Sequence, residues 1–592
     1  MLYYESGLSI LEEKMKISSK QKIGKVVLFA ALFLYTLKSI FVGADVDEAY
    51  GVTAGYRLVQ GDLLLKDLWE PHQTSAIFTA FFIRCALFLT GGSLNGLTIL
   101  LRVFFFGVQI AMTWYLYKTF CDCLPWLTKE ENGLLAIVYY LTTPKCIYVP
   151  EYSNLHMWFS TGMALFLMQF FCEASSKRNH DSRLILAGVM LACDVLAYPS
   201  MVLFYPVCLL YLICQSGAGD RLKRFLAFSL PCFAGALLLI GYLRSYMSFT
   251  EIAENIGFIL ADGSHQQSAA EKIRIAGEDL VHLFLMIAGC GIFAALVQKI
   301  LRKRNFAGKA EGQCTALLPG WIFLWMVMQT IFQVAVWFRS DYNSGYPQLT
   351  YIFLPCLGIL CCCKSVCKSR TGLYLVALGA VNYSCLNLFS NWKPGNLSVY
   401  LVTGLLGGLL CIREYFVECL QKRGAVWWKT LCILWIAMEI FGRSLLIIGG
   451  DPGSKMIYQI RGISRGAVQG GTLNSYMNSY RYNQNLQDFP EIVAPGSNVF
   501  YVGPSQYFYL LGDCRVTAPS TISTPEYDES LKVYFDRHPD RFPDVVVMES
   551  CYGDVSFLSE NDYIYTWIRE EFQPDTIEEY PYVRVYKKGG NE

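Results

Sequence analysis

The sequence predicts a polytopic α-helical membrane protein that carries a soluble α/β domain at its C-terminal end. Hydrophobic residues make up 54% of the 592 residues and charged residues only 16%, whereas about 25% of an ordinary soluble domain is charged. Apolar runs of membrane-spanning length recur between residues 25 and 449. From residue 450 to residue 592 these runs stop, and Pro, Gly, Asp and Tyr become frequent.

The apolar runs predict about thirteen spans, because each span needs roughly 20 mainly apolar residues. We expect them at residues 25–43, 98–119, 132–149, 155–172, 184–198, 200–214, 225–243, 281–299, 317–338, 348–363, 372–390, 397–413 and 429–448. The fifth and sixth runs are short and share Tyr198-Pro199, which predicts a kinked pair.

The distribution of Lys and Arg predicts the orientation in a plasma membrane. Lysines precede the first apolar run and no small-residue cleavage site follows it, so residues 1–24 are expected in the cytoplasm. Basic loops then alternate with loops that are poor in Lys, and an odd number of spans puts residues 450–592 outside the cell. The apolar stretch 75–91 contains Arg84 and would reverse every later loop if it crossed. We therefore expect it to be an interfacial helix on the outer leaflet.

The C-terminal region alternates between strand and helix patterns, which predicts a small α/β domain. We expect parallel strands at 499–502 and 545–548, helices at 527–538 and 561–572, and a final strand at 582–586. The region has no G-x-G-x-x-G motif and no P-loop, so a nucleotide-binding role has no support.

Net charge and cysteine usage narrow the functional classes further. The formal net charge of +1 gives no reason to expect a nucleic-acid partner. Most of the 22 cysteines lie in apolar runs, where cysteine behaves as a small hydrophobe. Cys514 and Cys551 are the cysteines of the C-terminal domain, and both a disulfide and two free thiols fit the sequence.

The first external loop, residues 44–97, contains the most informative cluster of polar residues. Asp45, Asp47 and Glu48 follow the first span directly, at the depth where the bilayer ends. Asp45 can cap a helix over residues 48–60. A carboxylate that is partly shielded from water at this depth could act as a general base. The alternative interpretation is a helix cap followed by a solvated loop, because acids at helix starts are common.

The order of residues in this loop resembles the first loop of the GT-C glycosyltransferase superfamily. After the acidic pair Asp47-Glu48 come Tyr50, Ala54, Gly61-Asp62 and Pro71-His72. The pattern is similar to the branch that contains the aminoarabinose transferases and the protein O-mannosyltransferases. It covers about the first 200 residues, and the remainder is similar in topology only. The spacing from Asp47 to Gly61-Asp62 is one residue shorter than that branch leads us to expect, which leaves Asp45 as a rival for the leading acid.

The resemblance implies inverting transfer of a sugar from a polyprenyl-phosphate donor to a lipid or glycan acceptor on the outer membrane face. It implies that Asp47, or else Asp45 or Glu48, deprotonates the acceptor hydroxyl. Cations would meet the donor phosphate, and the candidates are Arg57, Lys66, Arg244 and Arg339. For each of these cations, simple snorkelling to the interface is the competing explanation.

The loop after the third span supplies a second set of candidates. Many proteins of this superfamily have an acid here, whereas this chain has Asn154 at that position, with Glu151 and His156 close by. His72, His156 and His265 are further candidates for contact with phosphate or metal. No resident metal is expected, although a divalent cation is compatible with the chemistry.

Two other classes of function remain open on sequence grounds. A transporter or flippase for lipid-linked saccharides would need ionisable residues inside its spans, and often an internal repeat. Asp194 and Glu439 lie inside spans, but we detect no repeat. A non-catalytic envelope assembly protein would tolerate replacement of Asp45, Asp47 and Glu48.

Overall fold

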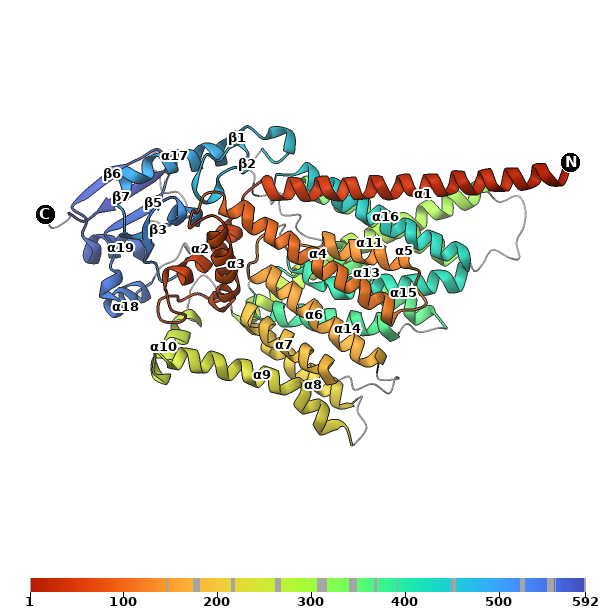
Figure 1. Cartoon of the computed structure of the whole chain (residues 1–592), viewed down its shortest axis with the longest axis horizontal. Helices are drawn as coiled ribbons and strands as arrows, with labels where there is room; N and C mark the ends of the chain where they lie inside the picture. The colour runs from red at the N-terminus through yellow and green to blue at the C-terminus, as the bar shows by residue number, and fades with distance from the viewer. Residues whose placement is uncertain are drawn as a thin grey trace.

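The structure is a computed structural model of the whole chain. It describes residues 2–144, 147–173, 181–214, 219–260, 268–305, 317–339, 349–366, 370–390, 392–447, 449, 454–521, 528–550, 558 and 561–589. Long helices lie side by side along one axis, and a small domain with a β-sheet lies at one end of this bundle (Figure 1). The N-terminus lies beyond the opposite end. A chain that crosses a membrane an odd number of times has its two ends on opposite sides, and the N-terminus and the C-terminal domain lie at opposite ends of this bundle.

A helix occupies each of the thirteen predicted spans. The helices are α1 (Leu2–Phe41), α4 (Leu97–Cys123), α5 (Lys129–Leu141), α6 (Tyr152–Glu173), α7 (Asp181–Ala197), α8 (Phe204–Cys214), α9 (Arg221–Arg244), α11 (Ala269–Asn305), α12 (Leu317–Arg339), α13 (Leu349–Lys364), α14 (Arg370–Phe389), α15 (Val402–Leu420) and α16 (Lys422–Leu445). Within the described ranges, nine helices are long and apolar enough to cross a membrane. The chain is therefore a multi-pass helical protein, and crossing by the four shorter helices α5, α7, α8 and α13 stays a prediction.

Three of the predicted spans differ from single straight helices for reasons that lie in the local sequence. The span expected at 132–149 is only the helix α5, which ends at Leu141, because Thr142 is extended and Pro144 cannot donate to a helix. The kinked pair expected at Tyr198-Pro199 is confirmed. There α7 ends, and the 3-10 helix η3 (Pro199–Leu203) leads into α8.

Helix α15 lies at the centre of the second half of the bundle, between α13 and α14. Its glycines permit this position, because a Cβ on Gly408 would lie 2.4 Å from the Leu354 carbonyl oxygen of α13. A Cβ on Gly379 of α14 would likewise lie 2.4 Å from the Gly404 backbone nitrogen. A Cβ on Gly404 itself would make only ordinary van der Waals contacts. Small residues at helix contacts let backbones approach closely in membrane proteins. By contrast, α1, α9 and α11 expose rows of large apolar side chains such as Leu237 and Phe284, as lipid-facing helices do.

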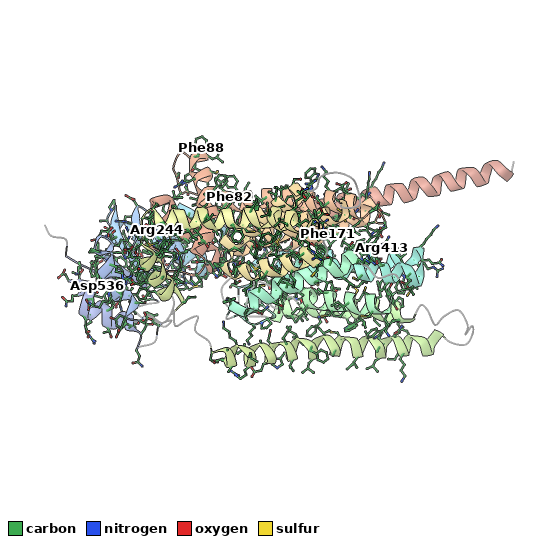
Figure 2. All side chains as sticks on the ribbon, turned by 90° about the horizontal axis from the view of Figure 1, so that it is seen from below. Phe82, Phe88, Phe171, Arg244, Arg413 and Asp536 are labelled. Carbon is green, nitrogen blue, oxygen red and sulfur yellow. The ribbon has the colours of Figure 1, made fainter. Side chains whose placement is uncertain are left out.

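The predicted first external loop, residues 44–97, folds as a short helical layer at the end of the bundle that bears the C-terminal domain. It contains α2 (Val46–Gln60), the 3-10 helix η1 (Gln73–Ser75) and α3 (Ala76–Leu89). The helix predicted at 75–91 is thus confirmed as α3, which packs against α2 and lies across the direction of the long helices (Figure 1). Phe81 and Phe88 of α3 are 63% and 86% exposed, and Figure 2 shows Phe88 projecting away from the bundle. The position of α3 on the outer leaflet of the membrane stays a prediction.

The C-terminal domain contains a five-stranded sheet in the order β4-β3-β5-β7-β6. The strands are β3 (Ser497–Val502), β4 (Cys514–Val516), β5 (Val545–Glu549), β6 (Thr576–Glu579) and β7 (Val583–Lys587). The predicted strands at 499–502 and 545–548 are confirmed as the parallel pair β3 and β5, and the final strand is β7, antiparallel to β5. A hairpin of β1 (Gly462–Ile463) and β2 (Leu473–Asn474) precedes the sheet.

Helices pack beside this sheet and complete its core. They are α17 (Tyr476–Ile492), α18 (Ser530–Arg537), α19 (Tyr563–Trp567) and the helical turn η11 (Ile568–Phe572). The helices predicted at 527–538 and 561–572 are confirmed, whereas α17, β4 and β6 were not predicted. Cys514 is a free, buried thiol that donates to the Tyr509 carbonyl oxygen over 3.4 Å, and Cys551 lies outside the described residues.

The close approach of α13 and α15 predicts that Gly408→Ala destabilises the bundle. The added methyl group must displace backbone atoms of Leu354, and overpacking of this kind costs about 1–3 kcal/mol. Gly107→Ala in α4 is the matched control, because a Cβ there meets nothing within 4 Å. We expect a lower thermal unfolding midpoint for Gly408→Ala in the same detergent, and an unchanged or slightly higher midpoint for the control. Equal midpoints for the two variants would contradict the packing described for α15.

Candidate functional site

The first three acids of the first loop lie at the start of α2 in different environments. Asp45 is the N-cap, with extended backbone, and its carboxylate accepts the Asp47 backbone N–H over 2.9 Å. The predicted capping role is therefore confirmed. The helix predicted at 48–60 begins at Val46 and ends at Gly61, whose φ of 105° lies in the left-handed region that favours glycine.

Glu48 forms a buried ion pair with Arg102 of α4. The Arg102 Nη2 and Nε atoms lie 2.6 and 2.7 Å from the two carboxylate oxygens, and both side chains are almost completely buried. Arg102 also donates to the carbonyl oxygens of Ile40 and Gly43 at the end of α1. The pair therefore fastens the start of α2 to two long helices, and both Glu48 oxygens accept bonds from one guanidinium.

Asp47 is half-buried in the first turn of α2, at helical spacing from Tyr50 and Gly51. Burial raises the pKa of the Tyr50 hydroxyl, and the nearby charges of Glu70, Asp47 and Glu151 raise it further. A Cβ on Gly51 would lie 2.6 Å from the Cβ of Glu151, so α2 packs directly against the start of α6. The acids of the first and second external loops therefore lie around a single buried hydroxyl.

The candidate residues of the second loop form hydrogen bonds both with nearby backbone groups and with a side chain of α7. Glu151 is buried, and its two oxygens accept the backbone N–H groups of Ser153 and Asn154, which start α6. Asn154 donates to the carbonyl oxygens of Ile147 and Val149 and shapes the preceding turn. His156 Nδ1 lies 2.7 Å from Asp194 Oδ1 of α7, and both side chains are fully buried. His156 and Asp194 are both candidates from the sequence, but no sequence signal predicts that they pair.

Aromatic rings connect these groups at the end of the bundle nearest the C-terminal domain. The His72 ring stacks on Tyr152 with centroids 4.1 Å apart and lies 4.7 Å from Tyr198. The Thr74 hydroxyl donates to the Leu196 carbonyl oxygen over 2.7 Å, which fastens the first loop to the end of α7. We call this group the domain-side cluster, and it consists of Asp47, Tyr50, Glu70, His72, Glu151, Tyr152, His156, Asp194, Tyr198 and Tyr400.

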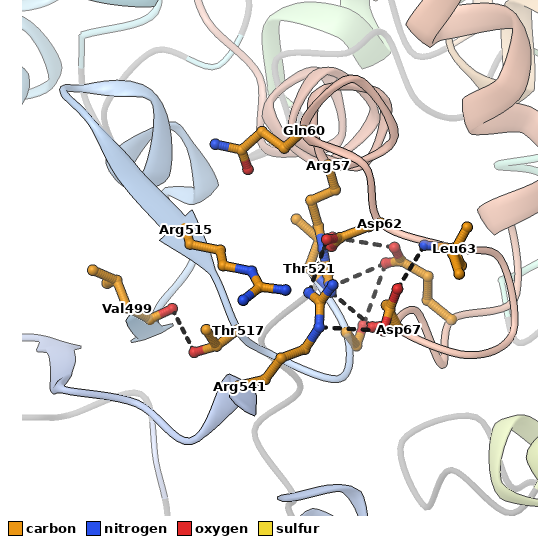
Figure 3. A network of polar contacts seen from close by, with 12 residues as sticks. Arg57, Gln60, Asp62, Leu63, Asp67, Val499, Arg515, Thr517, Thr521 and Arg541 are labelled. Atoms are coloured by element: carbon orange, nitrogen blue, oxygen red, sulfur yellow. Dashed lines mark hydrogen bonds and ion pairs between the residues drawn. The ribbon is translucent and has the colours of Figure 1, made fainter. Parts of the chain in front are cut away.

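Arg57 lies in a buried network between the first loop and the C-terminal domain (Figure 3). Its Nε atom lies 2.7 Å from Asp62 Oδ2, and its Nη2 atom donates to the Asp67 carbonyl oxygen over 2.7 Å. Arg541 of the C-terminal domain lies 2.8 Å from Asp62 and 3.2 Å from the carboxylate of Asp67. Burial alone would lower the pKa of Arg57, but Asp62 and other acidic groups nearby raise it, and the net shift is upward. The Arg57 guanidinium is therefore charged, and it donates its hydrogen bonds within this network.

The other predicted phosphate-binding cations lie nearer the surface. Lys66 and Arg244 are exposed, and they lie on segments that touch, because the Tyr246 hydroxyl donates to the Leu64 carbonyl oxygen over 2.9 Å. Figure 2 shows Arg244 close to the C-terminal domain. The side chain of Arg339 and the whole of His265 lie outside the described part of the structure.

Glu70 links the first loop to the C-terminal domain a second time. The Thr521 backbone N–H and hydroxyl both donate to its carboxylate over 3.1 Å. Burial is the largest influence on the pKa of Glu70 and raises it, while Arg57 and the bonds from Thr521 lower it, and the net shift is upward. No sequence signal predicts the contacts of Thr521 with Glu70 or of Arg541 with Asp62. The two residues of each pair are more than 400 positions apart along the chain.

Comparisons and metal geometry add little to this picture. Among the described residues, no three His, Cys, Asp or Glu side chains are gathered as a metal site requires. No family model matches the chain, and no curated protein is significantly similar to it.

The buried pair of Glu48 and Arg102 predicts a structural rather than a chemical effect of mutation. Replacement of Glu48 by Ala leaves a buried, unpaired guanidinium, which costs about 3–5 kcal/mol. We expect a large fall in folded yield and in the thermal unfolding midpoint. The double variant Glu48→Ala with Arg102→Met should recover much of the loss, because no buried charge then lacks its partner. No recovery in the double variant would show that the pair is not the source of the stability.

The environment of Glu70 predicts a dependence of stability on pH. Because the pKa of Glu70 is higher in the folded chain than its ordinary value, its contribution is fully present below that ordinary value. The contribution is lost as pH rises through the raised pKa of the folded chain. Replacement by Gln should therefore flatten the pH dependence of the unfolding midpoint in this window. An unchanged pH profile in Glu70→Gln would contradict this assignment.

Proposed function

We propose that the chain transfers a sugar from a polyprenyl-phosphate donor to a hydroxyl acceptor, with inversion at the anomeric carbon. The observation that supports this best is the position of Asp47. Asp47 is half-buried in the first turn of α2, where its charge acts on Tyr50 and where the same helix packs against the start of α6. A lipid-linked substrate would present its head group at that depth while its chain stays among the lipid-facing helices. The similarity of the first loop to GT-C enzymes supports the same function.

In this mechanism the Asp47 carboxylate accepts the proton of the acceptor hydroxyl. The acceptor oxygen attacks the anomeric carbon, the bond from that carbon to the phosphate oxygen breaks, and polyprenyl phosphate leaves with the electron pair. The phosphate is already a good leaving group, so the protein needs to supply a base, cations and correct positioning. Asp47 is the preferred base because it is half-buried, whereas Glu48 is fully buried in its ion pair with Arg102, and because it leads the acidic pair of the GT-C-like pattern.

Exposed cations on the same side of the structure would meet the donor phosphate. Lys66 and Arg244 lie on adjoining segments near the C-terminal domain, and both are exposed. Arg57 is less suitable for this role, because its bonds to Asp62 and Asp67 would have to break first. On this proposal the C-terminal domain faces the cell exterior and holds the first loop in shape.

The transporter hypothesis has weaker support from the ionisable residues of the spans. Asp194 is bonded to His156, and Glu439 lies 2.7 Å from Arg443 of the same helix. Arg443 also donates to the Thr143 hydroxyl over 2.6 Å. Each acid therefore lies beside a basic side chain, as acids in structural ion pairs do, which weakens the case for a transport path.

The proposal predicts that Asp47→Asn abolishes sugar transfer without unfolding the protein. Loss of a general base typically lowers turnover about 100-fold to 10,000-fold. The measurement is release of labelled sugar from a panel of polyprenyl-phosphate hexoses and pentoses by the purified protein in lipid. Asp45→Asn is the matched control, because Asn also caps helices well and should leave turnover within a few-fold of wild type.

Three other outcomes would change the assignment. Loss of turnover only in Asp45→Asn would move the base two residues earlier. Unchanged turnover in Asp45→Asn, Asp47→Asn and Glu48→Gln would rule out this mechanism. Movement of the labelled lipid across the bilayer without sugar release would favour a flippase.

A further inference from the structure

The order of the parallel strands in the C-terminal domain reverses between β3 and β5. From β3 the chain runs first to β4 on one side of β3 and then to β5 on the other side, and all three strands are parallel. In open α/β sheets, ligands bind outside the carboxyl ends of the strands at such a reversal. The side chains at the carboxyl ends of β3 and β5 are therefore candidates for a binding site that the proposed chemistry does not use.

Glu549 ends β5 and holds an arginine of α17 at these strand ends. One oxygen of its buried carboxylate accepts a hydrogen bond from the Tyr501 hydroxyl of β3, and the other accepts one from Arg481 Nη1. The Arg481 side chain is 32% exposed, whereas that of Glu549 is 7% exposed. A Cβ on Gly503 would lie 2.6 Å from the Glu549 Cβ, so the chain after β3 passes close to this carboxylate. The carboxylate thus orients an arginine that still reaches solvent.

Tyrosine rings continue the same edge of the domain. Tyr476 and Tyr480, one turn apart on α17, stack with their centroids 5.6 Å apart, and the Tyr480 ring meets the Tyr582 ring edge-on at 6.1 Å. The Tyr582 carbonyl oxygen accepts the backbone N–H of Ser550, which directly follows β5. Tyr476 and Tyr480 are 55% and 46% exposed. We call this group the tyrosine edge, and it consists of Tyr476, Tyr480, Arg481, Glu549 and Tyr582.

The chemistry of the tyrosine edge suits a neutral saccharide. Its rings offer apolar faces on which the C–H face of a sugar can pack, and its hydroxyl and guanidinium groups can form hydrogen bonds with sugar hydroxyls. Glu549 balances the charge of Arg481, so this pair carries no net charge that would attract a phosphate. A purely apolar ligand would have to remove water from the exposed part of Arg481, which is costly. A saccharide combines the apolar faces and the hydroxyl groups that the edge requires.

The helix that carries the tyrosine edge begins beside the segment that leads into the first loop. The Gly43 backbone N–H, just after α1, donates to the Leu473 carbonyl oxygen over 2.9 Å, and Leu473 lies in β2, which leads directly into α17. In the first turn of α17, the Asn478 side chain donates to the Gly449 carbonyl oxygen, just after α16, over 2.6 Å. A ligand on the tyrosine edge would therefore lie at the same end of the structure as Asp47.

We propose that the tyrosine edge binds a neutral oligosaccharide that serves as the acceptor of the transfer reaction. The acceptor role rests on the proposed function, and it specifies a glycan hydroxyl, rather than a lipid hydroxyl, as the group that Asp47 deprotonates. Tyr476 and Tyr480 pack against the apolar faces of the sugar rings. Arg481, oriented by Glu549, donates to the sugar hydroxyl oxygens. On this proposal the C-terminal domain selects the acceptor.

Binding is measured on the full-length protein in lipid nanodiscs by calorimetric titration and by saturation-transfer difference NMR, with empty nanodiscs as the blank. The probes are cellohexaose, mannohexaose, galactohexaose and chitohexaose, and hexagalacturonate is the anionic comparison. We expect at least one of the four neutral hexasaccharides to bind. Hexagalacturonate should bind no more tightly than galactohexaose, because the edge has no net positive charge to favour an acidic ligand.

Variants of the edge are compared with matched variants elsewhere in the same domain. Tyr480→Ala and Arg481→Gln should weaken binding of the hexasaccharide about 10-fold or more, because aromatic and arginine anchors carry most of the energy at recognition surfaces. Ile577→Ala is the control for loss of an exposed apolar side chain, since Ile577 is 60% exposed on the outer strand β6. Arg515→Gln is the control for loss of a paired arginine, since Arg515 pairs with Asp540 near the amino end of β3. Both controls should bind within about twofold of the wild type, as surface substitutions away from a site do.

Four results would overturn the inference. They are binding of none of the neutral hexasaccharides, binding that neither edge variant weakens, and binding of hexagalacturonate alone, which would assign the edge to an acidic ligand. The fourth is a wild-type dimer that Tyr480→Ala dissociates, which would assign the edge to a second copy of the chain. Equal thermal unfolding midpoints for Tyr480→Ala and Ile577→Ala show that a loss of binding does not come from misfolding.

Turnover separates the acceptor role from the proposed function. With the lipid-linked donor present, Tyr480→Ala should raise the KM for the bound hexasaccharide and leave kcat unchanged, because the ring holds the acceptor but takes no part in the chemistry. Transfer to lipid hydroxyls only would overturn the acceptor role and leave the proposed function standing. Hexasaccharide binding without turnover of any donor would refute the proposed function and leave the edge as a saccharide-binding site.

Discussion

The buried bond between Arg57 and Asp62 holds the end of α2 against the turn that follows it, and much of the domain-side structure depends on it. Arg541 extends the bond to the C-terminal domain, and Asp67 closes the network from the first loop. Charges in an enclosed site are stable only when each has partners in good geometry. The network therefore determines how the C-terminal domain docks, and the docked domain in turn covers Glu70 through Thr521.

The end of the bundle nearest the C-terminal domain is likewise organised around buried pairs of ionisable side chains. Glu48 of α2 is bonded to Arg102 of α4, and His156 of α6 is bonded to Asp194 of the next helix, α7. These bonds position α2 against α4 and α6 against α7. Within this frame Asp47 is only half-buried, which is what a group that must exchange a proton with a substrate requires. Glu48 and Asp194 are fully buried in their pairs, and the proposed base Asp47 differs from both of them in its partial exposure.

Local sequence patterns predicted most of the helical architecture. Apolar runs located a helix at each expected span, and the Asp45 cap and the helical spacing over residues 48–60 located α2, because both signals act over a few residues. The parallel strands β3 and β5 were predicted from continuous buried runs. The end of α5 was predicted too late, since the apolar run continues beyond Thr142 while Pro144 cannot continue the helix.

By itself, the sequence determined the multi-pass helical class, the presence of a helix at α3, the α/β pattern of the last domain and the list of polar residues in the first loop. It could not decide what each polar residue contacts. Arg57 was a candidate for binding phosphate, yet it donates hydrogen bonds to Asp62 and Asp67. Glu48 was a candidate base, yet it forms an ion pair with Arg102. Helix periodicity, capping and hydropathy depend on neighbours along the chain. The pairing of buried charges depends on groups that folding brings together from distant segments, so only the tertiary structure decided it.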